Sequence, residues 1–149
     1  MNRFHGVLSI LLMAVCLFLA FFSILSVSIF CGFIYLFISV IFFLLIIYMY
    51  CTKCPNITSN TCRHIFPGLI AKSLPAKKQS NYTYVELIIT VLSFLVIVIF
   101  PQYWLWKSNI LFILFWGILM LALIDVPIFI CKSCLNNYCI ICPNKKNII

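Results

Sequence analysis

Long runs without charged residues divide the chain into apolar segments. Residues 6–50 contain no Asp, Glu, Lys or Arg. As one helix this run would be about 68 Å long, at about 1.5 Å per residue, which is roughly twice the apolar core of a bilayer. Two helices, over about 6–26 and 31–50, explain the run better. The turn between them is predicted where residues with turn chemistry cluster: Ser26, Ser28 and Gly32.

Two further apolar runs follow a polar loop. The third helix should run from about 83 to 100, where Pro101 breaks an uncharged stretch, and the fourth from about 109 to 130. The pattern therefore predicts an all-α integral membrane protein with four transmembrane helices. We expect them to form two hairpins, with the polar segments outside the membrane: hairpins 1–50 and 83–130, loop 51–82 and tail 131–149.

The composition excludes a water-soluble globule. Of the 149 residues, 66% are apolar and 8% are charged, whereas a soluble domain has about 45–50% apolar and about 25% charged residues. This excludes a soluble enzyme, a disordered tail and a secreted disulfide mini-protein. The formal charge is +8. In a membrane protein we expect this charge to meet the lipid bilayer and its anionic headgroups, and not a nucleic acid.

The basic residues predict the orientation. Only Lys107 lies between the third and fourth helices. The other nine flank the opposite ends of the helices: Arg3, Lys53, Arg63, Lys72, Lys77, Lys78, Lys132, Lys145 and Lys146. By the positive-inside rule, both termini and loop 51–82 face the cytoplasm. We therefore expect an integral protein of the plasma (inner) membrane.

The loop contains a short amphipathic segment over about 66–74. Its apolar residues fall at helical spacing, with Lys72 opposite them: Phe66, Leu69, Ile70 and Leu74. Pro67 can open such a helix and Pro75 can end it. We expect it to lie on the membrane surface, with anionic headgroups bound at Lys72, Lys77 and Lys78.

The cysteines are concentrated in the two segments predicted to be cytoplasmic, which hold seven of the nine. Because the cytosol keeps thiols reduced, a structural set of disulfides is not expected there. Three C-x2-C pairs occur, at 51–54, 131–134 and 139–142. A C-x2-C turn brings two thiolates onto one tetrahedral ion, so this spacing favours metal binding.

Seven of the cysteines, together with His64, form two predicted ligand sets of four. The first comprises Cys51, Cys54, Cys62 and His64, and the second comprises Cys131, Cys134, Cys139 and Cys142. Both sets are typical of closed structural zinc sites, so two zinc ions are predicted. Whether the sets form two sites or exchange ligands in a shared one stays open. The pairs Cys54-Pro55 and Cys142-Pro143 also suggest iron–sulfur ligation, and reactive or acylated thiols are a further alternative.

Three titratable residues lie near the same membrane boundary. Asp125 falls inside the fourth helix, and an acid in a span is costly. We expect it to pair with Arg63 or Lys53, or to hydrogen-bond His64. Glu86 should favour the N-terminal dipole of the third helix, and His5, close to Arg3, should be solvated.

These features favour an accessory, scaffold or binding subunit whose metal-bound cap is structural. It would act within a larger membrane complex or a homo-oligomer. A membrane redox protein with iron–sulfur clusters or reactive thiols is the alternative, and metal-ion transport or delivery is a second one. The sequence contains no P-loop, nucleophile elbow or H-E-x-x-H motif, so an enzyme is not favoured.

Overall fold

The computed structural model describes residues 2–53, 65–75 and 82–130. All regular elements in these ranges are helical, and none is a strand. In chain order they are α1 (Asn2–Leu25), α2 (Ile29–Ile46), the π-helix η1 (Ile47–Cys51), α3 (Ile65–Ser73), α4 (Tyr84–Ile99), α5 (Gln102–Leu105), α6 (Asn109–Asp125) and the π-helix η3 (Val126–Ile130).

Four of the helical stretches are long and apolar enough to cross a membrane, as the sequence predicts. They are Phe4–Leu25, Ile29–Cys51, Tyr84–Leu105 and Asn109–Phe129. The predicted short helix in the loop is also present as α3. The protein is therefore an all-helical integral membrane protein. The side of the membrane on which its ends lie stays a prediction.

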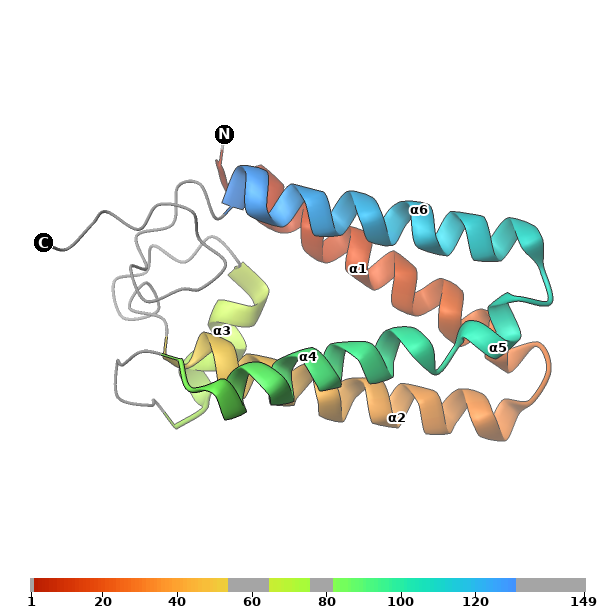
Figure 1. Ribbon diagram of the computed structural model, residues 1–149, viewed down its shortest axis with the longest axis horizontal. Helices are drawn as coiled ribbons and strands as arrows, with labels where there is room; N and C mark the ends of the chain where they lie inside the picture. Colours follow the sequence, from red (N-terminus) through yellow and green to blue (C-terminus); the bar gives the residue numbers. More distant parts are fainter. Residues whose placement is uncertain (1, 54–64, 76–81, 131–149) are drawn as a thin grey trace, which may run out of the picture.

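The four long helices run up and down along the long axis of the molecule (Figure 1). At one end lie the beginnings of α1 and α4, the helix α3, and the π-helices η1 and η3; we call this the cap end. At the other end, the turn end, lie residues 26–28 and α5. Because the number of spans is even, the first and last described residues both lie at the cap end.

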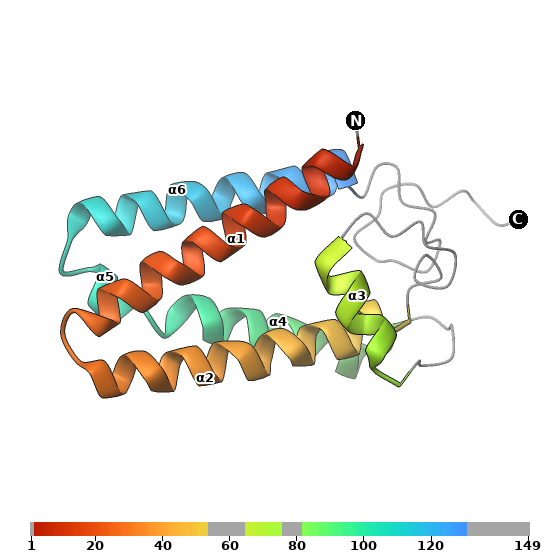
Figure 2. The same ribbon diagram turned by 180° about the vertical axis from the view of Figure 1, so that it is seen from behind.

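The helices associate in two antiparallel pairs, α1 with α6 and α2 with α4. Helix α1 runs obliquely between the pairs, beside α6 at the cap end and beside α2 at the turn end (Figures 1 and 2). The predicted second hairpin is therefore not a packed unit, since α6 packs chiefly on α1 and not on α4. Helix α5 and the following turn carry the chain from one pair to the other.

Small residues line the buried side of α1, which packs on α6 over the part nearer the cap end. They recur at intervals of three, four or seven along α1 and are all buried: Gly6, Ser9, Cys16, Ala20 and Ser23. The buried residues Phe115, Leu119 and Ala122 of α6 are spaced in the same way. The Cys16 thiol donates to the carbonyl oxygen of Phe115, with Sγ 3.7 Å from that oxygen. In lipid, where helix association depends on van der Waals contact, such small residues favour a tight pair.

The α2–α4 pair is fixed by one buried tyrosine. Tyr35 donates from its hydroxyl to the carbonyl oxygen of Ile97 at 3.2 Å. Its ring stacks on Phe100 with centroids 5.6 Å apart. Ser93 on α4 is also buried, and its hydroxyl donates to the carbonyl of Ile89 in its own helix. The hydroxyls of Tyr35 and Ser93 thus both have partners within the bundle, as a membrane interior requires.

The predicted turn chemistry is present at the turn end. Ser28 is the N-cap of α2, and its hydroxyl accepts a hydrogen bond from the backbone of Cys31. At Gly32 a Cβ atom would lie 3.1 Å from Cδ1 of Leu25, so a larger residue here would require the Leu25 side chain to shift. Pro101 ends the predicted third helix, and Gln102 beyond it accepts a hydrogen bond from the Trp116 indole at 3.1 Å.

A pair of matched substitutions on α1 tests the interface that its buried side forms with the rest of the bundle. Ala20→Leu should destabilise the protein by about 1–3 kcal/mol, because Ala20 is fully buried and the larger side chain would overpack the interface. Ala14→Leu adds the same atoms at an exposed position of the same helix and should have little effect. The midpoint of thermal unfolding in detergent micelles measures both. Equal effects would contradict this interface.

Candidate site at the cap end

The structure describes one of the eight predicted metal ligands. Cys51 ends η1 at the cap end and is half-buried. The other seven lie outside the described residues: Cys54, Cys62, His64, Cys131, Cys134, Cys139 and Cys142. Within the described ranges, no three His, Cys, Asp or Glu side chains gather in a way that could hold a metal ion. The two zinc sites, and the alternative clusters, therefore stay predictions.

The described residues do show how the chain reaches the first cysteine pair. At the end of α2 the helix widens into a π-turn over Ile47–Cys51. The amide of Thr52 donates to the carbonyl of Ile47 at 3.3 Å, which is the i−5 bond of a π-helix. The Thr52 hydroxyl donates to the carbonyl of Tyr48, one turn earlier, at 2.6 Å.

The chain reaches the second cysteine group in the same way. Helix α6 widens into a second π-helix over Val126–Ile130, directly before Cys131. Here the cause is Pro127, which has no N–H to donate to the residue four positions earlier and whose ring crowds that carbonyl. Both helices that lead into a cysteine group thus end in a π-turn at the cap end.

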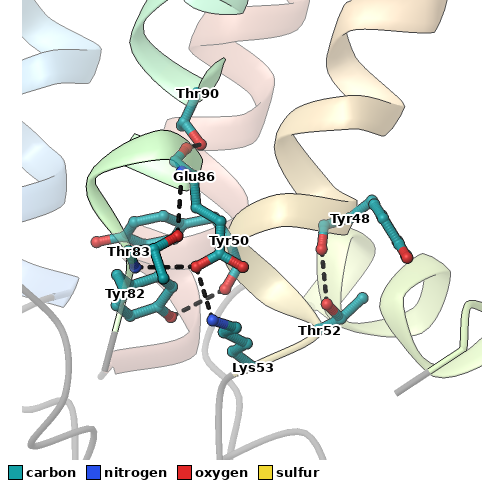
Figure 3. Close-up of polar contacts among 8 residues, drawn as sticks. All are labelled: Tyr48, Tyr50, Thr52, Lys53, Tyr82, Thr83, Glu86 and Thr90. Atoms are coloured by element: carbon teal, nitrogen blue, oxygen red, sulfur yellow. Dashed lines mark hydrogen bonds and ion pairs between the residues drawn. The ribbon is translucent and has the colours of Figure 1, made fainter. Parts of the chain in front are cut away.

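The first C-x2-C motif is held to α4 by an ion pair (Figure 3). Lys53, between Cys51 and Cys54, is buried, and its ammonium donates to Glu86 Oε2 at 2.6 Å. The same oxygen accepts from the backbone of Thr83 at 3.0 Å, while the Thr83 hydroxyl caps the first turn of α4. The expectation that Glu86 favours the start of this helix is consistent with this capping box, which the sequence analysis did not predict.

Two tyrosines cover this ion pair. The rings of Tyr50 and Tyr82 stack with centroids 4.6 Å apart, and the Tyr82 hydroxyl donates to the Tyr50 carbonyl at 2.9 Å (Figure 3). The Lys53 ammonium lies 5.9 Å from the centroid of the Tyr82 ring. The Tyr82 ring thus lies beside the ammonium of the ion pair.

The second buried ion pair joins α1 to α6 and corrects two expectations. Asp125 does not meet Lys53, which pairs with Glu86, and His5 is not simply solvated. Instead His5 Nδ1 lies 2.9 Å from Asp125 Oδ1, and the imidazole stacks parallel on Phe129 with centroids 4.1 Å apart. This pair was not expected from the sequence, because α1 begins at Asn2 and not near residue 6, which places His5 inside the helix. Arg63 and His64 lie outside the described residues.

Helix α3 lies across the cap end beside η1 and α1. Its small residues Gly68 and Ala71 are buried, whereas Phe66, Leu69 and Lys72 are exposed. This arrangement leaves two large apolar side chains and one cation on the surface of the short helix. The two other lysines predicted to bind headgroups, Lys77 and Lys78, lie outside the described residues.

Comparison with protein-family models, with curated proteins and with solved structures found no match to this chain. The interpretation of the cap end therefore rests on its own residues and geometry.

Removal of the Lys53 charge tests the ion pair that holds the first cysteine motif. Lys53→Met should cost about 1–3 kcal/mol, because it leaves the half-buried Glu86 without its cationic partner. Lys53→Met combined with Glu86→Gln should recover most of this loss, since glutamine can keep the capping box and no charge is then left without its partner. Lys107→Met, at an exposed lysine over the Tyr103 ring, is the control and should cost under about 1 kcal/mol. Unfolding in mixed micelles by increasing fractions of SDS gives the free energies. A loss at Lys53 no greater than at Lys107 would contradict the assignment.

Proposed function

We propose that the protein is a membrane-embedded accessory or scaffold subunit, and that its two cysteine-rich segments bind structural zinc at the cap end of the helical bundle. One observation supports the proposal above the others. The two helices that lead into the cysteine groups finish at the same end of the bundle, α2 through η1 at Cys51 and α6 through η3 directly before Cys131. Both groups of thiols therefore leave the membrane region from one end.

The proposed zinc is structural because each ligand set has four members. A tetrahedral ion held by four protein ligands has no open position for a substrate, so the ion would crosslink the segment and would not catalyse a reaction. Lys53 supports this role, since its ion pair with Glu86 holds the residues that precede Cys54 against α4. A fixed turn reduces the entropy that is lost when the ion binds.

Transport and metal delivery have less support from the described residues. Transport across a membrane uses polar residues near the middle of the bilayer. The two acidic residues, Glu86 and Asp125, are both paired at the cap end, and the polar residues buried within the spans are serines. The spans are therefore suited to packing, against one another or against partner subunits in a larger membrane complex or a homo-oligomer.

The proposal places the cap end on the cytoplasmic side of the plasma (inner) membrane, where zinc-binding thiols stay reduced. The exposed Lys72, Phe66 and Leu69 of α3 support contact with lipid on this side, with the lysine at anionic headgroups.

Metal analysis of the purified protein tests the proposal. The wild-type protein should contain about two zinc ions per chain and should be colourless. Replacing both Cys134 and Cys139 by serine should remove about one of them, because a tetrahedral site cannot lose two thiolates and persist. Cys31→Ser is the matched control. It removes one thiol in the first turn of α2, outside both ligand sets, and should leave the zinc content unchanged.

The same preparation separates the competing functions. If the protein contained iron and had a visible absorbance that disappeared on reduction, electron transfer would be supported in place of a structural role. Protein that is folded, monodisperse and free of metal would overturn the zinc cap and leave thiol chemistry or acylation as the role of the cysteines.

A further inference from the structure

The third span is interrupted at Pro101, and the carbonyls at the break have side-chain partners. Proline has no N–H, so the carbonyl of Ile97, four residues earlier, lacks its usual donor within the helix. The Tyr35 hydroxyl of α2 donates to this carbonyl at 3.2 Å. The next carbonyl, that of Val98, accepts from the side-chain amide of Gln102 at 2.6 Å. The chain therefore leaves α4 without an unpaired carbonyl at these two positions, and α5 begins as a separate helix (Figure 1).

One side of α5 is anchored to the bundle. The Trp116 indole of α6 donates to the side-chain oxygen of Gln102 at 3.1 Å. Leu105 is fully buried in the core. The Trp104 ring stacks on Phe100 with centroids 5.5 Å apart. These contacts determine which side of α5 faces away from the other helices.

The outward side of α5 and of the turn after it carries two aromatic residues and a cation. Tyr103 keeps 70% of its surface exposed, and Trp106 keeps 73%. The Lys107 ammonium lies 5.4 Å from the centroid of the Tyr103 ring. Within the described ranges neither the Tyr103 hydroxyl nor the Trp106 indole forms a hydrogen bond, in contrast to the Trp116 indole. Both aromatic side chains thus combine an apolar ring with a polar group that the bundle does not satisfy.

The exposed surface nearer the cap end has a different character. Its large side chains on α4, α6 and α2 include Ile99, Ile113 and Phe37, which are 60–70% exposed and carry no polar group. Such side chains suit the acyl chains of a bilayer. Tyrosine and tryptophan are instead enriched where the acyl chains meet the headgroups, because the ring is apolar and the O–H or N–H can bond to lipid or water. The change in side chains thus indicates a membrane boundary at α5.

The length of the next span places the boundary at the same level. The apolar stretch Asn109–Phe129 has 21 residues. At about 1.5 Å per residue it is about 30 Å long, which is the thickness of the hydrocarbon core. This stretch begins directly after the turn that follows α5. The turn therefore lies at the edge of the core when the stretch crosses it.

We propose that residues 102–108 lie in the headgroup layer of the membrane at the turn end, and that Tyr103, Trp106 and Lys107 bind phospholipid there. The indole and the hydroxyl donate to ester or phosphate oxygens of the lipid, and the ammonium contacts phosphate. The proposal assigns a lipid-binding surface to the end of the bundle opposite the cap. It does not depend on the proposed zinc sites, which belong to the cap end.

Fluorescence quenching in proteoliposomes tests the depth of α5. The protein is reconstituted in phosphatidylcholine that carries bromine either near the glycerol end of its acyl chains or near their methyl end. The difference between the wild-type protein and Trp106→Phe gives the signal of Trp106 alone. Because this side chain is exposed, the variant should fold normally. The Trp106 signal should lose more intensity to the bromine near the glycerol end, which lies closer to the headgroups.

Trp106→Phe combined with Phe37→Trp is the matched control. It moves the reporter to a lipid-facing position of α2, about 12 Å beyond Ile29 along the helix. This reporter should show the reverse order, with the greater loss of intensity to the bromine near the methyl end. Circular dichroism and the elution volume in detergent check that both variants keep the helical fold.

The position of α5 is decided by which quencher reaches Trp106. Preferential quenching by the bromine near the glycerol end, with the reverse order in the control, would establish the lipid-binding surface. Quenching by iodide ions and by neither bromolipid would place α5 in water and overturn the proposal. So would a signal that no quencher reaches, since α5 would then be covered by a partner subunit or a second copy of the chain. The same order as in the control would place Trp106 in the hydrocarbon core, which also contradicts the proposal.

Discussion

A membrane-embedded chain with two acidic residues needs a partner for each carboxylate. In this protein each of the two carboxylates bonds to a residue of a neighbouring helix and so joins one pair of helices. Asp125 joins α6 to α1 through His5, and Glu86 joins α4 to the end of α2 through Lys53. The partners are separated by 120 and 33 residues along the chain. A buried carboxylate without such a partner would be strongly destabilising, so these contacts restrict which helices can be neighbours.

The two ion pairs also distinguish the ends of the bundle. Both lie at the cap end, where the chain leaves the apolar helices for its lysine-rich and cysteine-rich segments. At the turn end the helices are held by close packing, through residues such as Ala20 and Leu105, and by short turns. This division follows from solvation, since ionised groups near the end of a span need less dehydration than groups at its centre.

The sequence was sufficient to predict the elements of this fold and insufficient to predict how they pair. Charge-free runs and Pro101 located the spans, and proline-bounded helical spacing located α3, because these signals are local. The choice of α1 as the partner of α6 depends on a stripe of small residues and on the His5–Asp125 contact, which are not local. His5 was misjudged because it stands near the beginning of the chain beside a basic residue, where solvation is the ordinary outcome. The burial of Lys53 was also not foreseen, although its place within C-x2-C limits where its side chain can go.

Polar contacts between helices contribute to structural specificity in a bundle of this composition. The spans consist mainly of Leu, Ile, Phe and Val, and lipid tails solvate such side chains as well as a neighbouring helix does. Apolar contact alone therefore distinguishes poorly between one helix register and the next, whereas an ion pair loses most of its energy when one partner moves by a turn. Two such pairs at one end would fix the register of η1 and η3, and hence the positions from which the two cysteine segments start. Zinc bound beyond these pairs would add strong crosslinks where the apolar spans end. The contacts that select one helix register over another would then lie mainly at the cap end.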